Sequence, residues 1–229
     1  MTATLNTYSP DYNGAPPHIL IMEDEEVVAK GLEMVLSEEG YNVDLAFTGE
    51  QALETFSSDK YDLLVADLRL PDVDGMEVIK KVKETQPETE VVVITGYSSV
   101  TSAVDAMKIG VFDYLTKPFV ETEIKEAVHG ALQKIHEEEA RIKNKVAQEE
   151  SKLIEKREVI RILDRTAEDQ RFWTDLMEND SEVLAGYNLS YEAQAAIMSG
   201  DLGWINRNIG ELTQKQLMFI TIKCGCEIW

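Results

Sequence analysis

The chain has 229 residues, 44% of them hydrophobic, and a formal net charge of −21. This length predicts one sizeable domain followed by a linker and a second, smaller unit. The negative charge repels a phosphate backbone and the sequence has no basic stripe to overcome it, so we expect no nucleic-acid partner. No apolar run approaches the roughly 18 residues of a membrane span, and the polar N-terminus lacks the layout of a signal peptide, which predicts a cytoplasmic protein without membrane contact.

Five short apolar runs alternate with segments of helical periodicity in the first half of the chain. The runs cover residues 18–22, 42–47, 63–66, 91–94 and 114–116. Such alternation predicts βα units that form an α/β domain with a doubly wound, five-stranded parallel sheet, covered by helices on both faces. In open sheets of this kind the chemistry lies beyond the carboxyl ends of the strands, so the residues that follow each run are the candidates for function.

Acidic side chains stand at the ends of the first and third runs. Glu23 and Asp24 follow the first run, and Asp67 follows the third. Because parallel strand ends meet at one edge of a sheet, we expect these carboxylates to cluster, and an oxygen-only cluster suits Mg²⁺. Thr95 comes directly after the fourth run and Lys117 directly after the fifth, which adds a hydroxyl and an ammonium. Together these groups are the equipment for phosphoryl transfer to a carboxylate.

Any one of these residues alone is more often a helix cap, a turn residue or a surface side chain. Their joint occurrence resembles the receiver domain of bacterial response regulators, especially receivers of the nitrogen-regulator type, over about residues 17–135. The matching residues, in chain order, are Glu23-Asp24, Asp67, Thr95, Tyr114 and Lys117-Pro118. The resemblance implies a flavodoxin-like fold, a sensor histidine kinase as partner, and a protein that modifies its own aspartate rather than an enzyme with a separate substrate.

The resemblance also implies which residues hold the phosphoryl group and the metal. Asp67 is implied as the phosphoacceptor. Glu23, Asp24, Asp67 and the backbone carbonyl of Arg69 are implied as the protein ligands of Mg²⁺. Many members of the family have two aspartates at the end of the first strand, whereas this sequence has Glu23 in the first place. The longer side chain leaves two alternatives open, a direct contact of Glu23 with the metal and a contact through water.

Three further roles follow from the resemblance. Thr95 and Lys117 are implied to contact phosphoryl oxygens, and the ring of Tyr114 is implied to swing inward when Thr95 closes on the phosphoryl group. The bond between Lys117 and Pro118 is expected to be cis, which aims the ammonium inward. The segment 70–75 fits the family's loop after the phosphoacceptor.

A helix-forming sequence without Gly or Pro runs from Ala131 to beyond Leu163 and predicts one extended helix. With Val128 taken as a d position, eight of the eleven heptad core positions are apolar. Those positions are Val128, Leu132, Ile135, Glu139, Ile142, Val146, Glu149, Leu153, Lys156, Ile160 and Leu163. We favour a dimerising coiled coil, which makes the chain a homodimer; the alternative is a solvated, charged linker.

A compact, aromatic-rich segment follows the predicted helix. Ser190 before Glu192 indicates a helix start, and glycines separate short helices, which predicts a small all-α module. The stretch 187–202 resembles the small helical domain of the small subunit of ring-opening extradiol dioxygenases, and similar domains in some precursor peptides of borosin-type, backbone-methylating pathways. A generic helical bundle is the alternative.

The end of the chain is apolar and prone to β structure. The segment from Thr213 to Gln216 is expected to be a polar hinge, and the residues after this hinge are expected to form a docking or modification tail outside any packed core. The candidate residues of this tail are Phe219, Ile220, Ile222, Cys224, Cys226 and Trp229. The two cysteines are too few for a disulfide scaffold or a four-ligand metal site.

The predicted organisation is a disordered arm (1–16), a receiver domain (17–135), a helical linker (136–167), a helical module (168–212) and the tail (213–229). We expect phosphorylation of Asp67 to control the helical module, which acts on an unknown output protein. Two other hypotheses stay open: a transcriptional regulator, and a regulator fused to a borosin-like precursor whose tail is modified. No dioxygenase iron site is expected, because the histidines all lie upstream of the module, at His18, His129 and His136.

Overall fold

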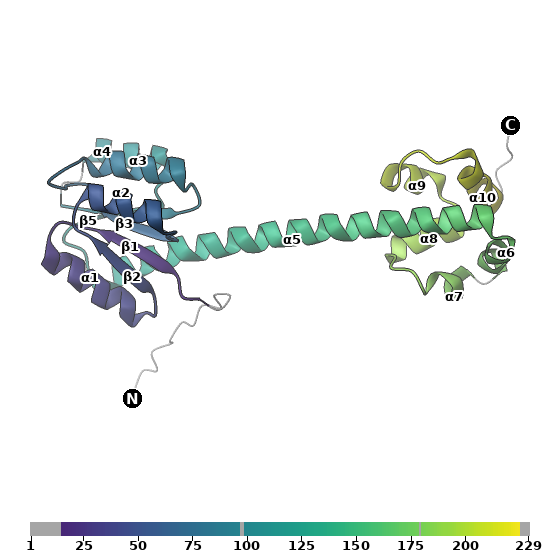
Figure 1. The fold of residues 1–229 in the computed structure, drawn as a ribbon, viewed down its shortest axis with the longest axis horizontal. Helices are drawn as coiled ribbons and strands as arrows, with labels where there is room; N and C mark the ends of the chain where they lie inside the picture. The colour runs from purple at the N-terminus through teal and green to yellow at the C-terminus, as the bar shows by residue number, and fades with distance from the viewer. Residues whose placement is uncertain (1–14, 97–98, 179, 225–229) are drawn as a thin grey trace, which may run out of the picture. The chain divides into compact units, whose positions relative to one another are not determined.

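The computed structural model describes residues 15–96, 99–178 and 180–224 (Figure 1). The chain forms two compact units, residues 1–140 and residues 141–229. Each unit has its own hydrophobic core and is described by itself. Of the expected N-terminal arm, all but the last two residues lie outside the described part of the chain.

The first unit contains a sheet of five parallel strands, as predicted. The strands are β1 (His18–Met22), β2 (Asn42–Ala46), β3 (Leu63–Asp67), β4 (Glu90–Thr95) and β5 (Asp113–Thr116). Their order in the sheet is β2-β1-β3-β4-β5. This order is that of a flavodoxin-like, doubly wound sheet, whose switch point lies between β1 and β3.

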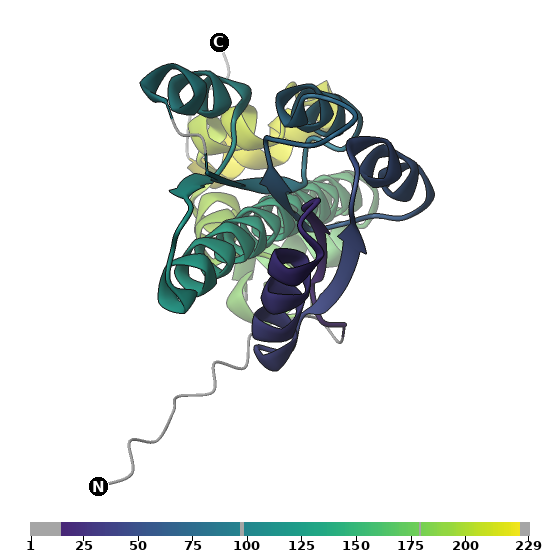
Figure 2. The same cartoon turned by 90° about the vertical axis from the view of Figure 1, so that its left-hand side faces the viewer.

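Helices cover both faces of this sheet (Figures 1 and 2). The helices are α1 (Glu26–Glu38), α2 (Gly49–Ser58), α3 (Gly75–Thr85), α4 (Val100–Ile109) and α5 (Glu121–Glu168). One core layer joins the sheet to α2, α3 and α4, and the other joins it to α1 and the first turns of α5. Every residue of β3 and β4 is buried because both faces of these central strands are covered.

The predicted extended helix is α5, which has 48 residues and begins ten residues before Ala131. Its first part packs in the sheet's core through Val128 and Leu132, and its last part packs in the second core through Val159, Ile162 and Leu163. The expected linker therefore contributes its final turns to the second unit. All residues from 136 to 154 are exposed.

The second unit is all helical, in agreement with the predicted fold class. The last turns of α5 are followed by α6 (Gln170–Glu178), α7 (Asp180–Leu184), α8 (Tyr191–Ser199), α9 (Leu202–Asn208) and α10 (Gln214–Cys224). Helix α8 begins where the sequence indicated, because the Ser190 hydroxyl accepts a hydrogen bond from the Ala193 N–H at 3.2 Å. It ends at Gly200, whose φ of 69° is left-handed and suits glycine.

The prediction of an unpacked tail is wrong for the described residues after 213. Phe219 is 3% exposed and Ile220 is 1% exposed, and both lie in the core of the second unit. The expected polar hinge is a helix start: the Thr213 N–H donates to Gln216 Oε1 at 2.8 Å, and the Gln216 N–H donates to Thr213 Oγ1 at 3.3 Å. Ile222 is 42% exposed, so this side chain faces solvent, as the prediction expected.

The remaining tail candidates are not tested by the structure. Cys226 and Trp229 lie outside the described residues, and of Cys224 only the backbone, in the last turn of α10, is described. No helix in the described part of the chain combines the length and the apolar character needed to cross a membrane.

Candidate functional site

Three carboxylates lie together at the carboxyl edge of the sheet. In the neighbouring strands β1 and β3, Met22 lies opposite Ala66, so the next residues, Glu23 and Asp67, stand at the same level. Oxygens of Glu23, Asp24 and Asp67 all lie within 4.8 Å of one another. Glu23 is fully buried and Asp67 is 5% exposed, whereas Asp24 is exposed. The cluster is therefore enclosed on one side and open to solvent on the other.

An ammonium group joins two of these carboxylates. Lys117 follows β5, and its Nζ donates to Asp67 Oδ2 at 2.7 Å and also to Glu23 Oε2. The Lys117 N–H donates to the carbonyl of Thr95 at 2.9 Å, which fixes the start of this loop against β4. The bond between Lys117 and Pro118 is cis, as predicted.

Burial and charge set the protonation of this pair. Burial raises the pKa of Glu23, because removing a carboxylate from water penalises its charged form, and the hydrogen bond from Lys117 partly opposes this rise. Burial also acts against the Lys117 ammonium, but its hydrogen bonds to Asp67 and Glu23 outweigh burial, so the pKa of Lys117 lies above its usual value. Lys117 therefore stays charged at neutral pH and offsets part of the repulsion between the carboxylates.

The donor set of the cluster fits a hard divalent cation. Glu23, Asp24 and Asp67 offer only oxygen atoms, and the exposure of Asp24 leaves room for water ligands. Mg²⁺ prefers such oxygen ligands and keeps several waters. The backbone of Arg69 is close as well, since its N–H donates to Asp67 Oδ1 at 3.0 Å. The metal contact expected of the Arg69 carbonyl stays a prediction.

The two remaining candidates differ in their position. Thr95 is the last residue of β4, fully buried, on the strand next to β3. Tyr114 lies in β5, half-buried, and its hydroxyl is 3.1 Å from the hydroxyl of Ser102 in α4. The structure thus brings Asp67, Lys117 and the acidic pair together at the strand ends, while the Tyr114 hydroxyl is bonded to α4.

Comparison with known proteins identifies the first unit. Residues 19–129 match the family described as the response regulator receiver domain. These residues are a receiver domain. The predicted family is thereby confirmed for this part of the chain, and the resemblance of residues 187–202 to dioxygenase and borosin-type domains stays a prediction.

Curated relatives match about half of this chain. The transcriptional regulatory protein DltR of Streptococcus agalactiae is 38% identical over 106 residues, which cover 46% of this chain and 47% of the relative. The response regulator ArlR of Staphylococcus aureus is 40% identical over 101 residues, which cover 44% of this chain and 46% of the relative. The chain thus spans about half the length of these relatives.

Solved receiver structures share the fold. A CheY-like receiver domain protein from Methanospirillum hungatei is 27% identical, with a TM-score of 0.53. The match covers 54% of this chain and 99% of the chain of that protein. The receiver of a LuxO repressor protein from Vibrio parahaemolyticus is 28% identical with the same TM-score, and covers 55% of this chain and 97% of its own.

Two residues of the receiver hold the loop around Asp67, and the sequence assigned them to the segment 70–75 without a role of their own. A Cβ atom at Gly75 would lie 2.5 Å from the carbonyl oxygen of Asp67, so this contact requires glycine. The Asp72 carboxylate accepts from the N–H groups of Glu50 at 2.8 Å and Gly49 at 3.1 Å, and these bonds hold the pKa of Asp72 below its usual value. Asp72 thus ties the loop after Asp67 to the start of α2.

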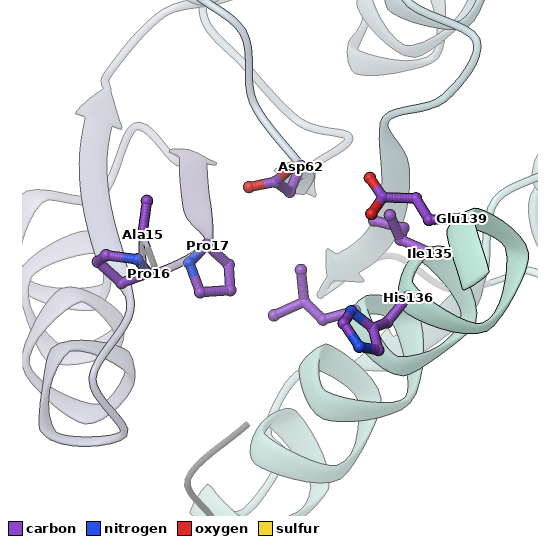
Figure 3. A pocket seen from close by; sticks show the side chains of 8 residues that line it. Ala15, Pro16, Pro17, Asp62, Ile135, His136 and Glu139 are labelled. Atoms are coloured by element: carbon purple, nitrogen blue, oxygen red, sulfur yellow. The ribbon is translucent and has the colours of Figure 1, made fainter. Parts of the chain in front are cut away.

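A pocket of about 250 Å³ lies on the receiver (Figure 3). It is lined by residues before β1 and β3, at the amino edge of the sheet, and by one side of α5. The lining side chains include Pro17, Asp62, Ile135, His136 and Glu139. Since Glu23, Asp24, Asp67 and Lys117 all lie at the opposite edge, the pocket is not part of this cluster.

Proposed function

We propose that this chain is a two-component response regulator in which a sensor histidine kinase transfers a phosphoryl group to Asp67. The observation that carries the proposal is the environment of Asp67: a carboxylate at the end of a central strand, 2.7 Å from the Lys117 ammonium and clustered with Glu23 and Asp24. Such positioning and charge neutralisation are what phosphoryl transfer needs from a protein.

In the proposed reaction an oxygen of Asp67 attacks the phosphorus of a phosphohistidine. The phosphorus–nitrogen bond breaks, its electron pair stays on the imidazole, and an acyl phosphate forms on Asp67. Lys117 is placed to neutralise the negative charge beside Asp67, and the buried Thr95 offers a hydroxyl at the end of the next strand. Glu23, Asp24, Asp67 and the Arg69 carbonyl would hold Mg²⁺, which would supply positive charge beside the transferred phosphoryl group.

The chain acts on its own aspartate in this proposal, and is not an enzyme with a separate substrate. The test is labelling by acetyl phosphate in the presence of Mg²⁺. We expect Asp67→Asn to abolish labelling, and Asp59→Asn, a matched change at an exposed carboxylate at the C-terminus of α2, to retain it. Mg²⁺-dependent labelling of the Asp67→Asn variant would contradict the assignment.

We propose that the second unit delivers the output by binding another protein. Its surface exposes large apolar side chains in a folded helical unit: Tyr191 is 87% exposed, Met218 58% and Met198 38%. Exposed apolar groups of this kind mark protein contacts more often than nucleic-acid contacts, which are built on basic groups.

Transcriptional regulation is a second candidate, because several relatives carry that description. The matches cover about half of each of these relatives, so their unmatched halves give no information on this chain. The acidity that argues against nucleic acid is itself concentrated in the first unit: residues 141–229 contain 12 Lys and Arg against 15 Asp and Glu. A binding assay with genomic DNA fragments at low salt separates the two candidates, since DNA retention that falls as salt rises favours transcription.

The borosin-like alternative has lost part of its support. A substrate tail must reach the active site of a modifying enzyme, yet Phe219 and Ile220 are buried in the second core. Intact-mass measurement after expression beside neighbouring genes tests what is left of this alternative, because stepwise methylation produces a regular mass ladder.

We also propose that the chain is a homodimer through α5. Between the two cores this helix exposes Ile142 (58%), Val146 (49%) and Leu153 (50%), which lie at heptad spacing on one face. Covering such side chains is favourable, and a second copy offers the same apolar face.

A further inference from the structure

The exposed part of α5 carries charged residues on the same face as its apolar residues. From 139 to 156 the heptad core positions are Glu139, Ile142, Val146, Glu149, Leu153 and Lys156. These six side chains, which we call the α5 seam, are exposed and belong to neither core, and Glu139 also lines the edge of the receiver pocket. Its three charges discriminate between the two possible directions of a partner helix.

A parallel, in-register dimer brings each seam residue opposite its own copy. Glu139 then faces Glu139, Glu149 faces Glu149, and Lys156 faces Lys156. Three of the six layers of the seam would therefore enclose two like charges between the helices. Like charges at a core layer repel and lose hydration, so each of these layers opposes association.

An antiparallel dimer removes all three like-charge layers. In one register Glu139 lies opposite the partner's Lys156, Ile142 opposite the partner's Leu153, and Val146 opposite the partner's Glu149. Symmetry repeats each pair once, which gives two ion pairs, two apolar layers and two mixed layers. We propose that α5 pairs with a second copy of itself antiparallel in this register, an inference that rests on the proposed homodimer.

Neighbouring antiparallel registers fit less well. A shift of one heptad in one direction places Glu139 opposite the partner's Glu149. The opposite shift places Val146 opposite the partner's Lys156 and Leu153 opposite the partner's Glu149. The register of the proposal is the one of these three that pairs Glu139 with a cation and keeps Ile142 on an apolar partner.

The charged residues beside the seam slightly favour the parallel direction. A parallel dimer would pair Glu138 with the partner's Lys143 and Lys145 with the partner's Glu150. The antiparallel dimer pairs Lys143 with the partner's Glu150 but sets Lys145 near the partner's Lys152. Flanking pairs stay in contact with water and contribute little, so the enclosed layers decide the direction.

Disulfide trapping tests the direction. Ile142→Cys and Leu153→Cys are made singly in a background with Cys224→Ser and Cys226→Ser, then oxidised alone and as a mixture. Residues 142 and 153 are eleven positions apart on one helix, about 16 Å, and a disulfide needs Cα atoms within about 7 Å. The proposal predicts that neither variant is trapped alone and that the mixture forms the mixed disulfide. Ser151→Cys, on the opposite face of the helix, is the control and should not be trapped with either.

Charge reversal provides a second test that leaves the apolar layers intact. Glu139→Lys should weaken the dimer about tenfold, since it sets Lys opposite the partner's Lys156 twice, and adding Lys156→Glu should restore the dimer. Glu137→Lys, an equal change of charge on the outward face, should leave the dissociation constant unchanged. In a parallel dimer Glu139→Lys replaces one like-charge layer by another, so it would have no such effect.

The possible outcomes separate this inference from the proposals on which it rests. Trapping of the Ile142→Cys variant alone would overturn the antiparallel direction, and it would still support the proposal of a dimer. A monomer by light scattering at roughly 50 µM, a concentration at which weak interfaces still assemble, overturns the dimer together with its direction. Neither result affects labelling of Asp67, which depends on the receiver.

Discussion

At the scale of single residues, the site balances charge within a partly buried space. Glu23 has no exposed surface, and its carboxylate is satisfied by Lys117 and by the N–H of Glu25 at 3.3 Å. One ammonium compensates two carboxylates, and the solvent-facing Asp24 adds a third negative charge. The excess of negative charge is what a divalent cation would neutralise, and so a bound cation should stabilise the receiver.

Mg²⁺ should therefore raise the melting temperature of the receiver, and Asp24→Asn should remove most of that rise. By linkage, a ligand at ten times its dissociation constant adds about 1.4 kcal/mol to the free energy of unfolding. Glu25→Gln is the matched control, since it removes the same charge one position away from the cluster. Melting followed by far-UV circular dichroism, with Mg²⁺ and with a chelator, measures the effect. An equal Mg²⁺ response in the Asp24→Asn variant would remove Asp24 from the metal site.

The cluster of carboxylates and the lysine could be predicted because each lies at or just after the end of a strand, and parallel strands end at one edge. Asp67 and Lys117 are 50 positions apart in sequence and 2.7 Å apart in space for this reason. The segment 70–75 was assigned to the right loop from the sequence, but the roles of Asp72 and Gly75 within it were not, because these roles depend on which backbone atoms approach them. The N–H groups that Asp72 caps belong to α2, 22 and 23 positions away, a contact that no local pattern contains.

At the scale of elements, α10 shows how tertiary packing overrides local propensity. The run around Phe219 and Ile220 is β-prone, yet the buried positions Gln216, Phe219 and Ile220 lie three and four residues apart, which is helical spacing. The amide of Gln216 also donates to the Asp164 carboxylate of α5 at 2.7 Å. The period of three to four was present in the sequence, but only the existence of a second core gives the apolar side a place to pack.

Phe219→Ala should destabilise the second unit by about 3–5 kcal/mol, because it removes a large buried side chain and leaves a cavity. The matched control is Met218→Ala, a truncation of the adjacent residue, which is 58% exposed and should cost little. Unfolding in urea, followed by tryptophan fluorescence, measures both. Equal small effects of the two substitutions would indicate that α10 is not packed on the unit.

At the scale of the whole molecule, one helix serves two cores. Ile124 to Leu132 of α5 belong to the core of the receiver, and Val159 to Leu163 belong to the second core. Among the described residues, none between 136 and 154 is buried. The cores of the two units share no residue among those that the structure describes, so we expect the units to unfold as separate cooperative transitions.

The distribution of tryptophan makes this separation measurable. All three tryptophans, Trp173, Trp204 and Trp229, lie in the second unit, so their fluorescence reports its unfolding, whereas circular dichroism reports both units. Mg²⁺ should raise the midpoint temperature of the receiver's transition, seen by circular dichroism, and leave the midpoint of the fluorescence transition unchanged. Phe219→Ala should lower the midpoint of the fluorescence transition and leave the midpoint of the Mg²⁺-dependent transition unchanged. If Mg²⁺ shifts both transitions equally, the units unfold together, and α5 transmits stability across its exposed turns.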